Sequence, residues 1–81
     1  MILEIYVVML DKSFDFKVNE KIPVGEMKKQ ILQELSMGGA GIFDGEQEDW
    51  SLVDVERECI PAENRTVEEN HIRGGSRLLL F

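Results

Sequence analysis

Two strongly apolar segments lie near opposite ends of this 81-residue chain, and they constrain its fold more than any other feature. The first, residues 2–10, is rich in β-branched and large apolar side chains, and the second covers residues 77–81. Such segments are typical of strands that are covered on both faces in the centre of a sheet. A chain of this length can bury a single core, so we expect one domain over residues 1–81.

The first apolar segment predicts a strand with a defined inner and outer face. Glu4 is expected to point to solvent, and side chains alternate along a strand, so the other residues divide into two sets. The inner set is Leu3, Ile5, Val7 and Met9. The outer set includes Tyr6, Val8 and Leu10. After a tight turn at residues 11–12, apolar and polar residues alternate over residues 14–19, which predicts a second strand in an antiparallel hairpin.

An amphipathic helix is predicted to follow the hairpin. Its apolar residues recur at spacings of three and four, at Val24, Met27, Ile31 and Leu35. Pro23 suits the first turn of a helix, because its φ is fixed and it lacks an N–H group. Gly38 and Gly39 are expected to end the helix, since glycine accepts the left-handed cap conformation. The glycine-rich, acidic residues 36–49 predict a loop.

The second half of the chain predicts shorter elements. Residues 50–55 indicate a third strand, and residues 59–60 a very short fourth strand before Pro61. The stretch 62–71 is polar and turn-like, with residues 66–67 starting one helical turn. A turn at residues 74–75 then leads to the last strand, residues 77–81. In that strand, Leu78 and Leu80 are expected inside, with Leu79 and Phe81 outside.

This order of elements resembles a ubiquitin-like domain over residues 2–81. The resemblance rests on the opening hairpin, the helix, and the polar turn 65–72, whose Ile72 precedes the last strand at the spacing found in ubiquitin. It implies an α+β, ubiquitin-like β-grasp fold, in which a mixed four- to five-stranded sheet packs on one α-helix. The first and last strands of that fold run parallel at the centre of the sheet.

Among ubiquitin-like proteins, the chain is most similar to the EsaB/YukD family, which is associated with type VII secretion systems of Gram-positive bacteria. The similarity rests on a length near 80 residues, on Pro23-Val24 at the start of the helix, and on a chain that stops at the last strand. It implies an accessory, protein-binding component of such a system.

The pair Gly74-Gly75 resembles a motif of ubiquitin and the sulfur carriers, which use a terminal Gly-Gly whose carboxylate is activated. Here the last strand follows the pair, and cleavage after Gly75 would remove that strand and much of the core. We therefore expect a turn and no conjugation. A sulfur carrier or ubiquitin-like modifier is the alternative, and a ubiquitin-like interaction domain of another complex is a third.

The sequence contains no constellation of residues that would support catalysis, so we expect no enzymatic activity. Cys59 would need a base beside it, and His71 is the one histidine. A cysteine next to Ile60 is more often a small buried hydrophobe, and His71 is expected at the surface or at a cap. The acidic residues 44–49 lack the ligand spacing of a calcium loop, so we expect no metal and no cofactor.

Charge restricts the class of partner. The chain has 16 acidic and 9 basic residues and a formal net charge of −7, which repels nucleic acid and anionic membranes. Ten of the acids lie between Asp44 and Glu69, either as a solvated region or as a docking site for a basic partner. No apolar run approaches the ~20 residues that span a bilayer, and the start lacks the features of a signal peptide. Cys59 is the sole cysteine, so no internal disulfide can form, and a cytoplasmic protein is expected.

The candidate site is the face of the sheet that points away from the helix. Its expected members are the protein-binding residues Tyr6, Val8, Leu79 and Phe81, with Trp50 at the rim as an aromatic anchor. An exposed apolar patch usually marks a binding site. The alternatives are that the long loop folds over these residues and covers them, or that they are isolated from one another. Ubiquitin-like domains commonly bind partners through this face, so we expect a non-catalytic adaptor or regulatory protein. The sequence also permits a homodimer that pairs through an edge strand or an apolar face.

Overall fold

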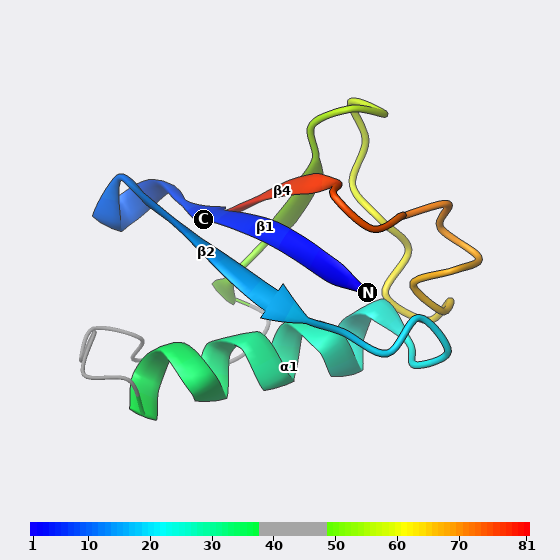
Figure 1. The fold of residues 1–81 in the computed structure, drawn as a ribbon, viewed down its shortest axis with the longest axis horizontal. Coiled ribbons are helices and arrows are strands. Elements are labelled where there is room, and N and C mark those ends of the chain that lie inside the picture. Colours follow the sequence, from blue (N-terminus) through cyan, green and yellow to red (C-terminus); the bar gives the residue numbers. More distant parts are fainter. Residues whose placement is uncertain (38–48) are drawn as a thin grey trace.

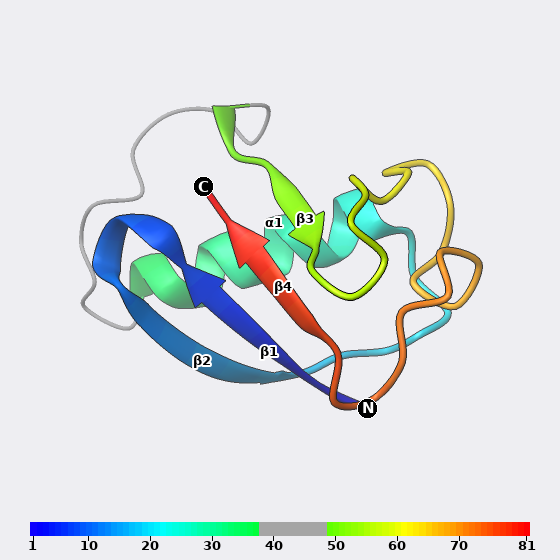
Figure 2. The ribbon, with the colours of Figure 1, turned by 90° about the horizontal axis from the view of Figure 1, so that it is seen from above.

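The computed structural model describes residues 1–37 and 49–81 as two layers, a single mixed sheet with one helix packed against one of its faces (Figures 1 and 2). The elements in chain order are strand β1 (Ile2–Val7), a short 3-10 helix (Val8–Leu10), strand β2 (Lys12–Lys17), helix α1 (Val24–Leu35), strand β3 (Leu52–Asp54) and strand β4 (Arg77–Leu80). The predicted α+β architecture is therefore confirmed. Residues 38–48 of the predicted loop 36–49 lie outside the described residues, and so do the two glycines, 38 and 39, that were expected to end the helix.

The two apolar end segments pair in the middle of the sheet, as predicted. The strand order is β2-β1-β4-β3, with β1 parallel to β4 and the outer pairs antiparallel. The inward side chains of the two central strands are fully buried against α1: Leu3, Ile5, Val7, Leu78 and Leu80. Each buried aliphatic side chain contributes roughly 1.5–3 kcal/mol, so this central pair carries much of the stability of the fold.

Helix α1 has the predicted bounds, and the chain caps its start with backbone groups instead of a side chain. Pro23 is the N-cap residue, with φ −62° and ψ 148°. The N–H groups of Val24 and Gly25 donate to the carbonyls of Arg65 at 2.8 Å and Glu63 at 3.0 Å. A Cβ on Gly25 would lie 3.3 Å from the Glu63 carbonyl oxygen, so glycine permits this close approach. The segment after β3 is thereby fixed to the helix N-terminus.

Lys28 forms a second set of contacts between α1 and the segment that follows β3. It lies on α1 with its side chain 2% exposed, and its Nζ donates to the Trp50 carbonyl at 2.8 Å and to Glu63 Oε2 at 2.6 Å. One buried ammonium therefore joins the helix to the residue two positions before β3 and to the segment that follows β3. A buried charge is tolerated only with such partners.

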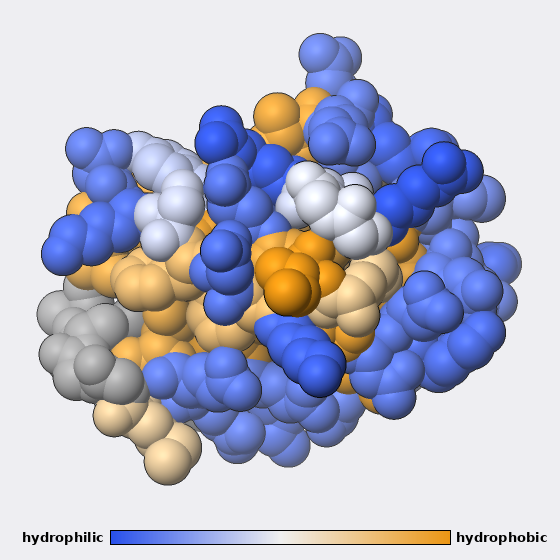
Figure 3. All heavy atoms as spheres, viewed as in Figure 1, coloured by the Kyte–Doolittle hydropathy of each residue, from blue (hydrophilic) through white to orange (hydrophobic). Residues whose placement is uncertain are grey.

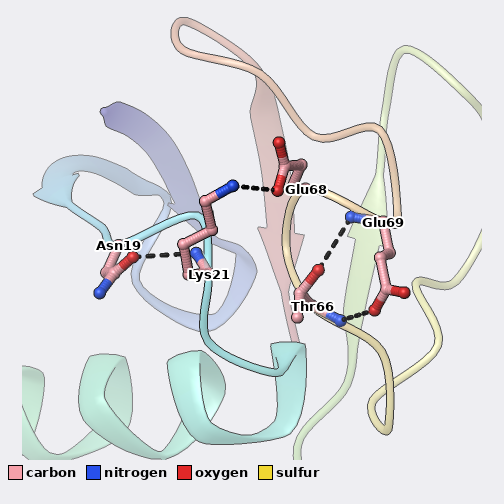
Figure 4. Close-up of polar contacts among 5 residues, drawn as sticks. All are labelled: Asn19, Lys21, Thr66, Glu68 and Glu69. Atoms are coloured by element: carbon pink, nitrogen blue, oxygen red, sulfur yellow. Dashed lines mark hydrogen bonds and ion pairs between the residues drawn. The ribbon is translucent and has the colours of Figure 1, made fainter.

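The polar segment 62–71 forms a hydrogen-bonded turn (Figure 4). The Thr66 N–H donates to Glu69 Oε1 and the Glu69 N–H donates to Thr66 Oγ1, both at 3.0 Å, which is the reciprocal pattern of a capping box. The hydrogen bond from the Thr66 N–H is the main cause that holds the pKa of Glu69 below its usual 4.5, and the hydrogen bond with the Thr66 side chain lowers it further. Lys21, in the segment before α1, forms an ion pair with Glu68 of this turn, with 2.7 Å between Nζ and Oε2.

The first strand is shorter than predicted, which corrects the placement of Met9 and Leu10. β1 ends at Val7, and residues 8–10 turn as a 3-10 helix that Asp11 closes with φ 52°. Met9 was expected inside and is 61% exposed, because the alternation of the strand does not extend to it. Leu10, expected outside, is half-buried and packs against the core.

The region of β3 also differs from the prediction. β3 covers residues 52–54, and the predicted fourth strand is a single bridge between Cys59 and Asp54 that closes a turn. The Asp54 carboxylate accepts the N–H groups of Glu56 at 3.1 Å and Arg57 at 3.3 Å inside that turn. Cys59 is exposed, so the expectation of a buried cysteine is wrong. Its backbone continues the outer edge of the sheet, where Ile60 beside it is exposed too.

The glycine pair forms the predicted turn. Gly75 has φ 87°, a left-handed conformation, and its N–H donates to the Ile2 carbonyl at 2.8 Å. Ser76 is buried and closes the turn, because its N–H donates to the Arg73 carbonyl and its Oγ accepts the Arg73 N–H. β4 begins directly afterwards and ends one residue earlier than predicted, at Leu80.

Candidate functional site

One apolar row crosses the face of the sheet that points away from α1. Tyr6 on β1 is paired in register with Leu79 on β4, and Leu79 is paired with Val53 on β3. Each of these residues alternates with buried neighbours on its own strand, so all three point to the outer face. All three are only partly buried, which leaves the row accessible to solvent.

Two more apolar side chains lie beyond this row at the same end of the central strands. The N–H and carbonyl of Phe81 exchange hydrogen bonds with Ser51 at 3.0 and 2.7 Å, so the alternation continues past β4 and Phe81 faces the same side as Leu79. Phe81 is 51% exposed. Val8, in the turn directly after β1, is 46% exposed. We call Tyr6, Val53, Leu79 and Phe81 the outer patch, and we leave Val8 out because the 3-10 helix ends the alternation that would place its side chain on this face.

Polar contacts border the outer patch on the side of β1. The Tyr6 hydroxyl is hydrogen-bonded to the Asp11 carboxylate, and this bond is the main cause that raises the pKa of Tyr6. Glu4 and Arg77 form an ion pair two residues before Tyr6 and Leu79 on their strands, and so on the same face of the sheet. Two kinds of contact therefore hold the Tyr6 side chain: its hydroxyl is hydrogen-bonded to Asp11, and its ring lies in the apolar row beside Leu79.

Trp50 does not lie at the rim of this face, which corrects the sequence prediction. Its side chain is 7% exposed and belongs to the main hydrophobic core. The Lys28 ammonium binds its carbonyl, and this draws the residue toward α1. Val53 is the patch residue that the sequence interpretation missed. The alternation of residues 52–54 around it was the available signal.

Among residues 1–37 and 49–81, no group of three or more His, Cys, Asp or Glu side chains gathers that could hold a metal ion. Cys59 and His71 are both exposed, the latter with φ 60° in the turn that ends the 62–71 segment. Within those same ranges, no helix is both long and apolar enough to cross a membrane.

Comparisons with known proteins support the fold. No protein-family model matches the chain. No curated protein matches it either. A solved structure similar to this one is the solution structure of the N-terminal ubiquitin-like domain in the 4931431F19Rik protein. The match has a TM-score of 0.77 at 16% sequence identity and covers 100% of this chain and 72% of that chain. The fold is thus ubiquitin-like, as the sequence resemblance implied.

Proposed function

We propose that this chain is a non-catalytic protein-binding module whose outer patch is its contact surface. The observation that carries this proposal is the apolar row of Tyr6, Leu79 and Val53, which the half-exposed Phe81 extends on a face that α1 leaves uncovered. Buried apolar area contributes about 25 cal/mol per Å², so a partner that covers this row gains affinity from it. Aromatic residues such as Tyr6 and Phe81 commonly supply the strongest contacts.

We further propose that the partner is a subunit of a type VII secretion system and that the chain serves there as an adaptor or regulatory component in the cytoplasm. The support for this role is the similarity to the EsaB/YukD family in length and in the Pro23-Val24 start of the helix. The proposal includes the absence of conjugation. Gly74 and Gly75 occupy a turn that leads into β4, whose Leu78 and Leu80 are core residues.

Affinity purification of the tagged chain from its native host, with mass spectrometry of the bait and its companions, tests this function. Secretion ATPase or channel subunits that copurify with a bait ending at Phe81 would support it. A bait that ends at Gly75, or one covalently linked to other proteins, would contradict the absence of conjugation.

A paired variant tests the surface in the same experiment. Tyr6→Asp with Phe81→Asp should abolish copurification, because two charges then lie within the outer patch. Gln33→Asp with Asn64→Asp is the matched control, since both positions are exposed elsewhere and the change in net charge is the same. If the patch variant keeps its companions and a native circular dichroism spectrum, the proposed surface is wrong.

A further inference from the structure

Strand β2 is the longer free edge of the sheet. It lies outermost beside β1 and spans six residues, whereas β3 at the other edge spans three. The outer side of β3 is also partly occupied, because Asp54 pairs there with Cys59. An exposed edge strand presents unpaired backbone groups that can add another strand.

The direction of these backbone groups follows from the ladder between β1 and β2. Met1 and Val18 exchange both of their hydrogen bonds, at 3.0 and 2.7 Å. Since such pairs recur at every second residue, Phe16 and Phe14 also turn their backbone groups toward β1. The intervening residues Asp15 and Lys17 therefore direct their N–H and carbonyl groups outward. In the described part of the chain, no strand pairs with them there.

The charges along this edge are self-complementary in one antiparallel register. A two-fold axis at Phe16 would pair Asp15 with Lys17 of a second copy, and Lys17 with Asp15 of that copy. Both pairs use the outward backbone groups, and both place opposite charges on the same face of the sheet. An axis at Asp15 or at Lys17 would instead set like charges opposite one another, which is destabilising. An axis at Phe14 would set Asp15 opposite Ser13 and would form no charge pair within β2.

The same register also matches apolar groups on the inner face. It places Phe16 opposite Phe16 of the second copy and Phe14, which is half-buried, opposite Val18. A groove between β2 and α1 runs beside these positions, and Phe16, Val18, Met27 and Ile31 contribute its apolar lining. Figure 3 shows hydrophobic side chains in a band between the sheet and the helix, with hydrophilic residues on either side of it. The partner's Phe14 would cover part of this band.

We propose that two copies of this chain pair through β2, antiparallel about a two-fold axis at Phe16, and form one continuous eight-stranded sheet. Lysine on an edge strand usually discourages pairing, but here each Lys17 finds an acid of the other copy. The assembly closes at two copies, because each copy uses its β2 edge once. Both outer patches then lie on the same face of the joined sheet, so the dimer presents two binding surfaces side by side to a repeated or symmetric partner.

Sedimentation equilibrium of the full chain, with charge-reversed variants, tests this proposal. The unmodified chain should show a reversible monomer–dimer equilibrium. D15K and K17D should each weaken the dimer about tenfold or more, because each places like charges at both symmetric pairs. The D15K/K17D double variant should restore the dimer. An equimolar mixture of the D15K chain and the K17D chain should form a heterodimer.

Two controls keep the result specific to this edge. K29D makes the same charge change as K17D on an exposed residue of α1, and it should leave the dimer unchanged. Amide exchange measured by NMR should show the N–H groups of Asp15 and Lys17 protected only at concentrations where the dimer forms. A chain that stays monomeric at millimolar concentration overturns the proposal. So does a dimer that K17D leaves intact, or one that the double variant fails to restore.

Discussion

Replacing Glu63 by glutamine is expected to destabilise the fold, although the Glu63 side chain is half exposed, because the change removes the counter-charge of the buried Lys28 ammonium. Breaking a fully buried ion pair costs about 3–5 kcal/mol, whereas an exposed pair contributes about 0–1 kcal/mol. The side chains of Lys28 and Glu63 are 2% and 51% exposed, so solvent screens one partner only. We therefore expect Glu63→Gln to lower the free energy of unfolding by about 2 kcal/mol.

Lys28→Met is the informative companion variant. It keeps a long apolar stem on α1 and leaves no buried charge, so its cost is limited to the hydrogen bonds to the Trp50 carbonyl and Glu63, or about 1 kcal/mol. In the Lys28→Met background, Glu63→Gln should then cost less than about 0.5 kcal/mol.

Urea unfolding of the four chains, followed by circular dichroism, measures this coupling. The thermal midpoint of Glu63→Gln should fall by about 8–16 °C. If Glu63→Gln alone changes the free energy of unfolding by less than about 0.5 kcal/mol, the reasoning about the buried ammonium is refuted. Costs that add in the double variant would refute it equally, because Lys28 and Glu63 would then act independently.

Two further variants test the turns that fix the second half of the chain. Glu69→Gln should remove a pH-dependent part of the stability: because the folded-state pKa of Glu69 lies below 4.5, this part is present above pH 4.5 and lost as the pH falls through the lower folded value. The urea midpoints of the two chains should therefore converge toward acid pH, and a constant difference would contradict the assignment. Gly75→Ala should cost about 1–2 kcal/mol in urea unfolding, since φ at Gly75 is 87°. Gly74→Ala, where a Cβ meets only Met1 at 3.7 Å, is the control and should cost clearly less.

Those parts of the fold that depend on local periodicity could be predicted from the sequence. The spacing of Val24, Met27, Ile31 and Leu35 predicted α1 with its observed bounds, since one apolar stripe on a 3.6-residue repeat permits a single buried face. Alternation in β1 and β4 likewise predicted the outward positions of Tyr6, Leu79 and Phe81 on the outer patch.

The errors arose where a turn or a single contact, and not the periodicity of a strand or helix, decides the structure. Residues 8–10 have strand-forming composition, yet the left-handed Asp11 closes a 3-10 turn that exposes Met9. Trp50 precedes a strand and resembled a rim residue, but it is buried in the core and its carbonyl binds Lys28, 22 positions away. Cys59 next to Ile60 resembled a buried pair, and its bridge to Asp54 holds it at the exposed edge.

Photo-crosslinking inside the native host tests most directly whether the outer patch binds a partner. A photoreactive phenylalanine analogue would replace Phe81 in one chain and Lys29, on the exposed side of α1, in another. The account predicts a covalent adduct from position 81 that is heavier than two copies of the chain and contains a different protein, with none from position 29. An adduct from position 29 alone, or from neither position, would contradict the claim that this face is the binding surface.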